Sequence, residues 1–348
     1  MSATTPVLRD TELTGRVTFR RTLLVCGVLL LVLLATVLGT SLLGSETLPT
    51  RSALCAIISL GNSPCGLSPE QSTILLEIRF PRILLAGAVG ASLAAAGASY
   101  QALLRNPLAE PYLLGISNGA AVGTMVALVF FGGFDWSRPL LAFVGALFAT
   151  LVVYRLGQGR AGATPERLIL AGVIVTTFLS SAIVFVTTLM DATRIRAFTF
   201  WLLGDLSGAT TNLLLLAIFI AVAATLVLAA NARSLNLLML GERDAFDLGV
   251  EVGRVRLVVF IAASLLVGSS VASGGSVGYV GLVVPHLVRL SLSSDNRITI
   301  PAAALAGALF VIVADTIART IIAPRELPVG AITALIGAPL FVYLLKRH

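Results

Sequence analysis

Apolar stretches of membrane-span length dominate this sequence, and they limit what the chain can fold into. A helix of about 20 apolar residues crosses the roughly 30 Å hydrocarbon core of a bilayer. The stretches are separated by short polar segments and lie at 23–44, 81–104, 112–132, 138–157, 167–190, 212–230, 256–273, 277–291, 301–321 and 328–345. The pattern predicts an all-α integral membrane protein with about ten transmembrane helices.

These segments leave little room for a separate soluble domain. Residues 1–21 are polar and carry four arginines, so we expect them to form a cytoplasmic N-terminal tail. The apolar run that begins at Leu23 is too long for a signal peptide, whose apolar core has about 7–15 residues. We therefore expect residues 22–348 to form a single transmembrane domain.

Charge content supports a lipid environment. Charged residues make up 12% of the chain, whereas a soluble domain usually carries about 25%. So few charges cannot cover a surface that faces water. The net charge of +7 does not indicate nucleic-acid binding, because the basic residues recur between apolar runs instead of forming one patch.

The sequence contains no motif for nucleotide binding or catalysis. Its one lysine, Lys346, lies two residues from the end, whereas a P-loop needs G-x-x-x-x-G-K-[ST]. With two histidines and no recognisable nucleophile motif, we do not expect an enzyme. Any ATP-driven role would require a partner that binds ATP and Mg²⁺, with no cofactor bound by this chain.

Basic residues also predict the orientation. Of the 24 Lys and Arg residues, 16 fall on the side of the termini and 8 on the other side. Because cytoplasmic loops are enriched in Lys and Arg, we expect both termini in the cytoplasm. An even number of spans agrees with this placement.

The three cysteines lie near the N-terminal end of the chain. Cys26 falls within an apolar run, where a small buried residue is expected. Cys55 and Cys65 fall in the first polar loop, on the predicted outer side, and they either form a disulfide or remain two free thiols. No metal site is expected from so few ligands.

The longest predicted cytoplasmic segment, residues 231–256, holds a large share of the chain's charge. Residues 242–248 favour a short helix, which Gly249 can end with a left-handed cap. Phe246 and Leu248 stand among the charged residues. This composition suits docking onto a soluble partner, and a solvated loop is the alternative.

Glycine and proline mark two further segments. Residues 274–289 contain four glycines and Pro285, which permit a broken or tightly packed helix. His286 beside them is interpreted as a packing or hydrogen-bonding residue, with a proton relay or haem ligand as alternatives. Residues 105–115 contain two prolines and predict a tight turn. Small residues at four-residue spacing, as at Gly115, Gly119 and Gly123, predict packing seams between helices.

Polar residues within the spans raise two more hypotheses. Asp315 and Arg319 are four residues apart, so they share a helix face and can form a pair. An unpaired charge at the bilayer centre costs about 2.5–3.5 kcal/mol on insertion scales. Hydroxyl groups on the fifth span either line a polar path or bond carbonyls of their own helix; these residues are Thr176, Thr177, Ser180 and Ser181.

From about residue 79 to its end, the chain resembles the permease subunits of bacterial ABC importers for iron-siderophores, haem and cobalamin. The resemblance is carried by RFPRILLAGAVGASLAAAGASYQALLRNPLAEPYLLGISNGAA, FWLLGDLSGA, GERDAFDLGV, GYVGLVVPHLVRL, ADTIARTIIAPRELPVG and TALIGAPLFVYLL. It implies a ten-helix subunit in the cytoplasmic membrane that pairs with a second copy or a close relative. Two cytoplasmic ATPase subunits and an extracytoplasmic binding protein would complete the importer.

The resemblance also implies roles for particular residues. The segment GERDAFDLGV matches the one that couples such permeases to their ATPases, and the fifth span would help form the gate. Coupling is thereby assigned to Glu242, Arg243, Asp244, Ala245, Phe246, Leu248 and Gly249. Asn296 departs from the family pattern, where a histidine is common.

The cargo, the docking surface and the energy source stay open at this point. Ferric siderophore is the first choice of cargo, with cobalamin and haem as alternatives. A secondary transporter driven by an ion gradient is the alternative from another class. Basic residues predicted near the outer surface are candidates for contacting a binding protein; these are Arg51, Arg79, Arg82 and Arg325.

Overall fold

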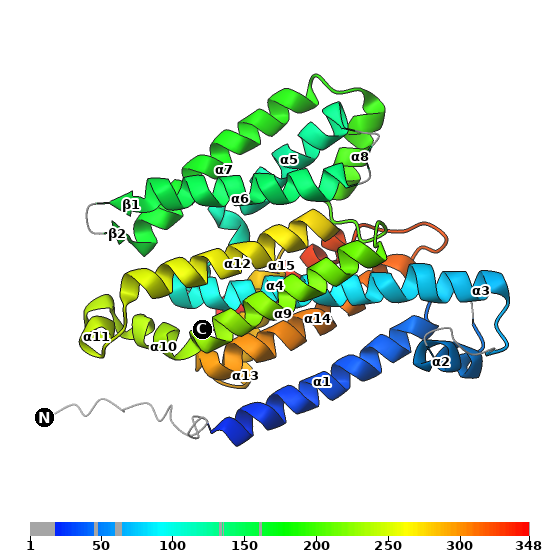
Figure 1. The fold of residues 1–348 in the computed structure, drawn as a ribbon, viewed down its shortest axis with the longest axis horizontal. Coiled ribbons are helices and arrows are strands. Elements are labelled where there is room, and N and C mark those ends of the chain that lie inside the picture. Colours follow the sequence, from blue (N-terminus) through cyan, green and yellow to red (C-terminus); the bar gives the residue numbers. More distant parts are fainter. Residues whose placement is uncertain are drawn as a thin grey trace, which may run out of the picture.

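The structure is a computed structural model that describes residues 18–44, 48–59, 65–131, 134, 136–159 and 162–347. Most of the predicted N-terminal tail, residues 1–17, lies outside the described residues. The described residues are almost entirely helical (Figure 1).

Each predicted span coincides with one helix. These helices are α1 (Phe19–Leu42), α4 (Phe80–Leu103), α5 (Ile116–Phe130), α6 (Ser137–Gly157), α7 (Pro165–Thr187), α9 (Thr211–Ala230), α12 (Val252–Gly274), α13 (Val280–Ser291), α14 (Asn296–Thr320) and α15 (Val329–Arg347). Among the described residues, seven helices are long and apolar enough to cross a membrane, and α5, α13 and α15 are shorter apolar helices. The count of ten spans and the placement of the termini stay predictions.

Shorter elements lie at the two ends of the bundle (Figure 1). One end holds α2 (Thr50–Ile58), α3 (Pro69–Thr73) and α8 (Ala192–Leu202). The opposite end holds α10 (Ala232–Leu240), α11 (Glu242–Asp247) and the antiparallel pair β1 (Gln158–Gly159) and β2 (Gly162–Ala163). From the charge asymmetry of the loops, we expect the first end on the outer side and the second end in the cytoplasm.

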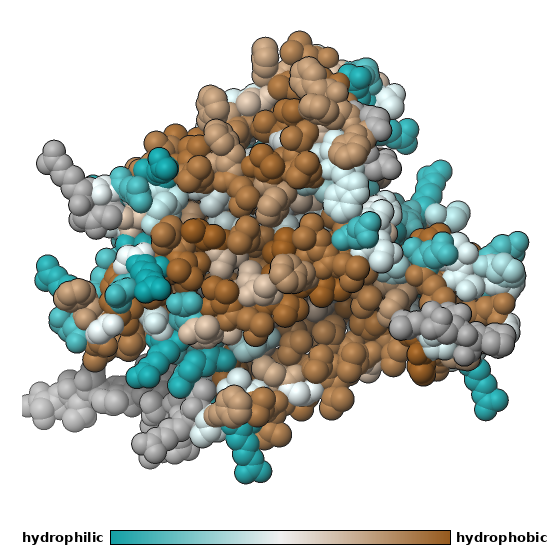
Figure 2. Space-filling model, viewed as in Figure 1, coloured by the Kyte–Doolittle hydropathy of each residue, from teal (hydrophilic) through white to brown (hydrophobic). Residues whose placement is uncertain are grey.

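The surface between these ends is apolar. Figure 2 shows hydrophobic residues over the middle of the molecule and polar residues gathered toward its two ends. Large side chains such as Phe178, Phe185 and Phe219 are about two-thirds or more exposed. Continuous exposed apolar surface of this kind would be unstable in water, so the chain is a multi-pass integral membrane protein.

Helix α4 forms the centre of the bundle and packs against α14, α12, α13 and α9. Its small residues allow this, because a Cβ added at Gly90 would overlap the carbonyl oxygen of Gly307, and one at Gly97 would overlap that of Gly281. Close backbone approach replaces the hydrophobic drive that is missing between helices in lipid. The predicted seams are thus confirmed as packing contacts, and Gly119 likewise fits against Gly145 of α6.

The glycine-rich segment 275–279 is unwound, as the sequence predicted. It separates α12 from α13, and Tyr279 adopts a left-handed φ of +66°. Side chains from the 105–115 segment satisfy its backbone. The Tyr279 N–H donates to Glu110 Oε1 at 3.2 Å, while the Tyr112 hydroxyl lies 3.0 Å from both the nitrogen and the oxygen of Val277. Without these partners, each backbone N–H or C=O group left unbonded at membrane depth would cost several kcal/mol.

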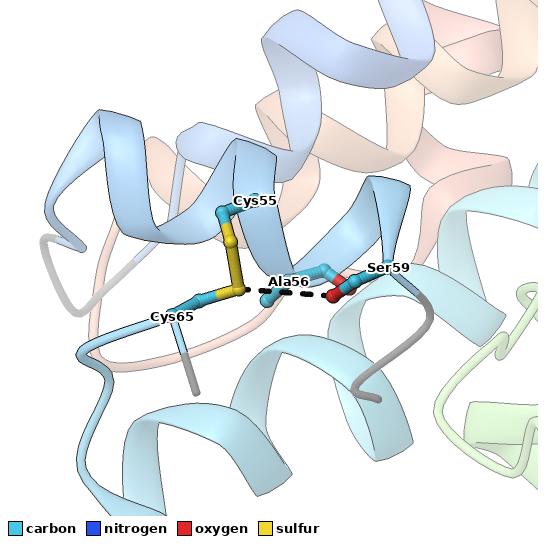
Figure 3. The surroundings of a disulfide bond; sticks show 4 residues. All are labelled: Cys55, Ala56, Ser59 and Cys65. Carbon is cyan, nitrogen blue, oxygen red and sulfur yellow. Dashed lines mark hydrogen bonds between the residues drawn. A yellow bond between two sulfur atoms is a disulfide. The ribbon is translucent and has the colours of Figure 1, made fainter. Parts of the chain in front are cut away.

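The described part of the first polar loop contains α2 and α3. Ser68 and Gln71 form a capping box that starts α3, which continues through the π-helical turn Ile74–Arg79 into α4. Cys55 of α2 and Cys65 form a disulfide, which confirms one of the two alternatives (Figure 3). A small apolar cluster around Ala53, Ala56 and Leu75 lies beneath it.

We predict that Gly97→Ala destabilises the protein, because the added methyl group would meet the Gly281 backbone, which cannot move without shifting α13. Overpacking of this kind costs about 1–3 kcal/mol or more. Thermal unfolding in detergent, followed by fluorescence size-exclusion, measures the loss. The matched control is Gly39→Ala on α1, where a Cβ meets nothing within 4 Å. Equal melting temperatures for the two variants would contradict the packing argument.

Candidate functional site

The segment predicted to couple the chain to an ATPase forms a compact helical turn at the end of the bundle that holds α10 and the β1–β2 pair. Gly241, at a φ of +148°, separates α10 from α11. Gly249 takes a φ of +84°, and the Val250 N–H donates to the Ala245 carbonyl at 2.9 Å. This is a Schellman-type ending, so the predicted left-handed cap is confirmed.

The side chains of α11 divide between the body and the solvent. Ala245 is fully buried, whereas Phe246 is 71% exposed and Leu248 is 62% exposed. Arg243 and Asp244 are exposed as well, and Glu242 is held by ion pairs to Arg105 and Arg256. Two exposed apolar side chains among charges form a protruding surface that a soluble protein can bind.

The hydroxyl groups on α7 differ in their hydrogen-bond partners. Thr177 and Ser181 donate to their own helix carbonyls, at 2.9 and 3.1 Å. Ser180 instead accepts from Asn118 Nδ2 on α5 at 2.7 Å, and the same nitrogen donates to the Thr176 carbonyl at 3.0 Å. Thr177, Ser180 and Ser181 are exposed in the single chain. Asn118 was missed by the sequence analysis, although an amide within an apolar span is itself a signal.

Two of the four candidate docking arginines are placed differently from the prediction. Arg51 and Arg325 are exposed. Arg79 and Arg82 are only 5% and 7% exposed. The expectation that these two present an outer surface is wrong for this structure, because the unbroken helix from Pro69 turns them toward neighbouring helices.

Arg82 instead belongs to a buried ion cluster between α4 and α14. Asp315, fully buried, accepts from Arg82 Nε at 3.1 Å and from Arg319 Nε at 2.9 Å. Arg82 Nη1 also reaches Glu326 Oε2 at 2.6 Å. The predicted Asp315–Arg319 pair is confirmed, while the sequence analysis missed Arg82 and Glu326 as partners.

Another polar network joins α10 to the C-terminal end of α13 and the N-terminal end of α14. The fully buried Asn296 donates from its backbone and side-chain nitrogens to Asn236 Oδ1, at 2.9 and 2.8 Å. Arg289 Nη2 donates to Asn296 Oδ1 at 2.9 Å. Beside it, burial would raise the pKa of Asp295, but hydrogen bonds from Arg297 and Asn236 hold that pKa below its ordinary value. The residue that departs from the family pattern thus has a structural role.

His286 matches the packing interpretation. Its ring meets Phe341 edge to face, with the ring centroids 6.5 Å apart. Among the described residues, no group of three or more His, Cys, Asp or Glu side chains is arranged to hold a metal ion.

We predict that Asp315→Ala costs about 3–5 kcal/mol of stability, because it removes the buried carboxylate that pairs with Arg319 and leaves Arg82 only its half-exposed partner Glu326. The melting temperature and the yield of membrane-inserted protein measure the effect. Glu251→Ala is the control, since it breaks an exposed pair with Arg254 that contributes about 0–1 kcal/mol. If Asp315→Ala were as mild as Glu251→Ala, the cluster would have no stabilising role.

Comparison with known proteins gives consistent matches along the chain. The sequence model of the FecCD transport family matches residues 27–347. The hemin transport system permease protein HmuU of Yersinia pestis is 37% identical, over 93% of this chain and 96% of that protein. The vitamin B12 import system permease protein BtuC of Vibrio cholerae is 40% identical, over 81% and 85%. A solved metal-chelate type ABC transporter in an inward-facing conformation superposes with a TM-score of 0.82 at 29% identity, covering 93% of this chain and 99% of that one.

Proposed function

The chain belongs to the FecCD transport family, and on that premise we propose that it is the permease subunit of an ATP-driven importer for a metal chelate in the bacterial cytoplasmic membrane. The observation that carries this proposal is α11, a short helix at one end of the bundle with Phe246 and Leu248 exposed and Ala245 buried. A membrane chain without a nucleotide-binding motif needs such a surface to receive work from another subunit.

The proposed assembly contains a second permease copy or a close paralogue, two cytoplasmic ATPase subunits and an extracytoplasmic binding protein. ATP and Mg²⁺ bind to the ATPase subunits. ATP can shift the permease only by binding more tightly to one arrangement of the complex than to the other. We assign the docking of the ATPase to Glu242, Arg243, Asp244, Ala245, Phe246, Leu248 and Gly249.

The polar face of α7 is the proposed path or gate. Thr177, Ser180 and Ser181 are exposed in the single chain, where a second permease copy would face them across the path. Two of these hydroxyls already bond their own helix, so they offer weak, general polarity to a cargo. At the outer end, we propose that Arg51 and Arg325 contact the binding protein through acidic residues on its surface.

The cargo is proposed to be a ferric siderophore, with haem and cobalamin as the alternatives. Relatives that transport hemin and vitamin B12 favour these alternatives, and the structural neighbour is a metal-chelate type transporter. Uptake into proteoliposomes separates the three. The vesicles hold the complex with its ATPase and its binding protein, and each receives iron-55 siderophore, hemin or cyanocobalamin with and without ATP. ATP-dependent uptake of none of the three would contradict the proposal.

ATP hydrolysis by a partner, and not an ion gradient, is the proposed energy source. The chain is an ABC transporter permease by family, so an ion-gradient-driven carrier is no longer a competing interpretation. Asp315, the intramembrane carboxylate that such a carrier would use, is held by two arginines. Collapse of the proton gradient should therefore leave ATP-dependent uptake intact.

We predict that Phe246→Ala weakens the association of the permease with its ATPase about 30-fold, the effect expected for an anchor residue worth about 2 kcal/mol. Co-purification at graded ATPase concentrations and uptake by the complex measure the loss. The control is Phe219→Ala on α9, which removes an equally exposed ring, 70% against 71%, from the lipid-facing surface. Equal association for both variants would place the docking surface elsewhere.

A further inference from the structure

Arg256, in the first turns of α12, is a buried cation that joins two separate elements. The residue is 5% exposed. Its Nη2 lies 2.5 Å from Glu242 Oε1, and its Nη1 donates to the backbone carbonyl of Ala163. A guanidinium group can hold both partners at once because its nitrogens form a rigid planar fork.

The two partners belong to the two parts of the proposed transport machinery. Glu242 is the first residue of α11, the proposed docking helix. Ala163 ends β2, two residues before Pro165 begins α7. One side chain therefore connects the segment that would receive motion from an ATPase with the start of the helix that carries Thr177, Ser180 and Ser181.

The space around this connection is open. A cavity of about 460 Å³ lies between α11 and the ends of α6 and α12, lined by residues that include Phe246, Tyr154, Gln158 and Arg256. The bridge from Glu242 through Arg256 to the Ala163 carbonyl lies at the wall of this cavity and joins α11 to β2.

Burial makes the link resistant to separation. Arg256 Nε is buried without a hydrogen-bond partner among the described residues, and the carboxylate in direct contact with the guanidinium group there is that of Glu242. Separating the two would leave a buried cation unpaired, which is strongly unfavourable. A displacement of Glu242 therefore draws Arg256 and the Ala163 carbonyl with it more readily than it breaks the bridge.

We propose that Arg256 is a positioning residue that relays movement of α11 to the N-terminal end of α7, so that ATP binding at one surface moves the proposed gate. The proposal rests on the function proposed above. It assigns the transmission to the bridge Glu242–Arg256–Ala163, not to docking itself, so the two can be separated by experiment.

The central test uses the assembled importer with its ATPase and binding protein. Arg256→Lys keeps the charge but replaces the planar fork of nitrogens with a single ammonium nitrogen, which cannot hold Glu242 and the Ala163 carbonyl in the same geometry. The variant should assemble and hydrolyse ATP, while uptake per ATP hydrolysed falls about fivefold or more, the range of a typical coupling between sites. Arg297→Gln is the control, because it breaks an exposed cytoplasmic pair with Asp295 and should leave uptake unchanged.

Hydrogen–deuterium exchange supplies a readout that a merely stabilising role would not alter. In the wild-type complex, ATP should change the exchange of peptides that cover residues 162–170, and Arg256→Lys should abolish that change while α12 stays protected. If Arg256→Lys transported with wild-type coupling, or if hydrolysis and uptake fell together through loss of assembly, the relay would be overturned. Failure of the wild-type complex to show ATP-dependent uptake would instead overturn the proposed function.

Discussion

Backbone-to-backbone packing around α4 is the constraint on which the rest of the structure depends. Lipid offers no hydrophobic drive that would bring one apolar helix onto another. The contacts of Gly90 with Gly307 and of Gly97 with Gly281 bring α14 and α13 within range of α4. Only at that range can Arg82 reach Asp315, at 3.0 Å. The ion cluster is therefore a consequence of glycine packing, and it then fixes the rotation of α14 against α4.

The lipid environment also constrains the irregular segments, because no water is present to bond their backbone groups. Backbone that leaves a helix inside the membrane must find partners within the protein. The unwound residues 275–279 find them in Glu110 and Tyr112, which reach back from a turn more than 160 residues earlier in the chain. The break between α12 and α13 is thus satisfied by a second irregular segment, the proline-containing turn at 105–115, which lies beside it.

Span positions could be predicted because each apolar run carries its own signal, and the α11 cap could be predicted because Gly249 marks it. The partners of the buried charged residues could not be predicted from the sequence. The free-energy cost of an unpaired charge in the membrane indicates that Asp315 needs a counter-ion. Sequence spacing does not identify Arg82 as that counter-ion, because it is 233 residues away. Arg79 and Arg82 were misplaced because the sequence does not show which way each side chain points, and the helix that begins at Pro69 turns both of them toward neighbouring helices. The Arg256 bridge escapes sequence analysis altogether, since a backbone carbonyl such as that of Ala163 has no residue signature.

The two ends of the bundle differ in how closely their helices are held together. At the outer end, Asp315 and two arginines hold α4 and α14 together within a closely packed interior. At the other end, α11 borders a cavity and connects to the β1–β2 turn through Arg256. Helix α7 packs mainly on α5, α6 and the short turn Pro111–Leu114, and these helices form a layer beside α12 (Figure 1). Since that layer does not share the α4–α14 interface, the proposed movement of the N-terminal end of α7 would leave the α4 glycine contacts and the ion cluster intact.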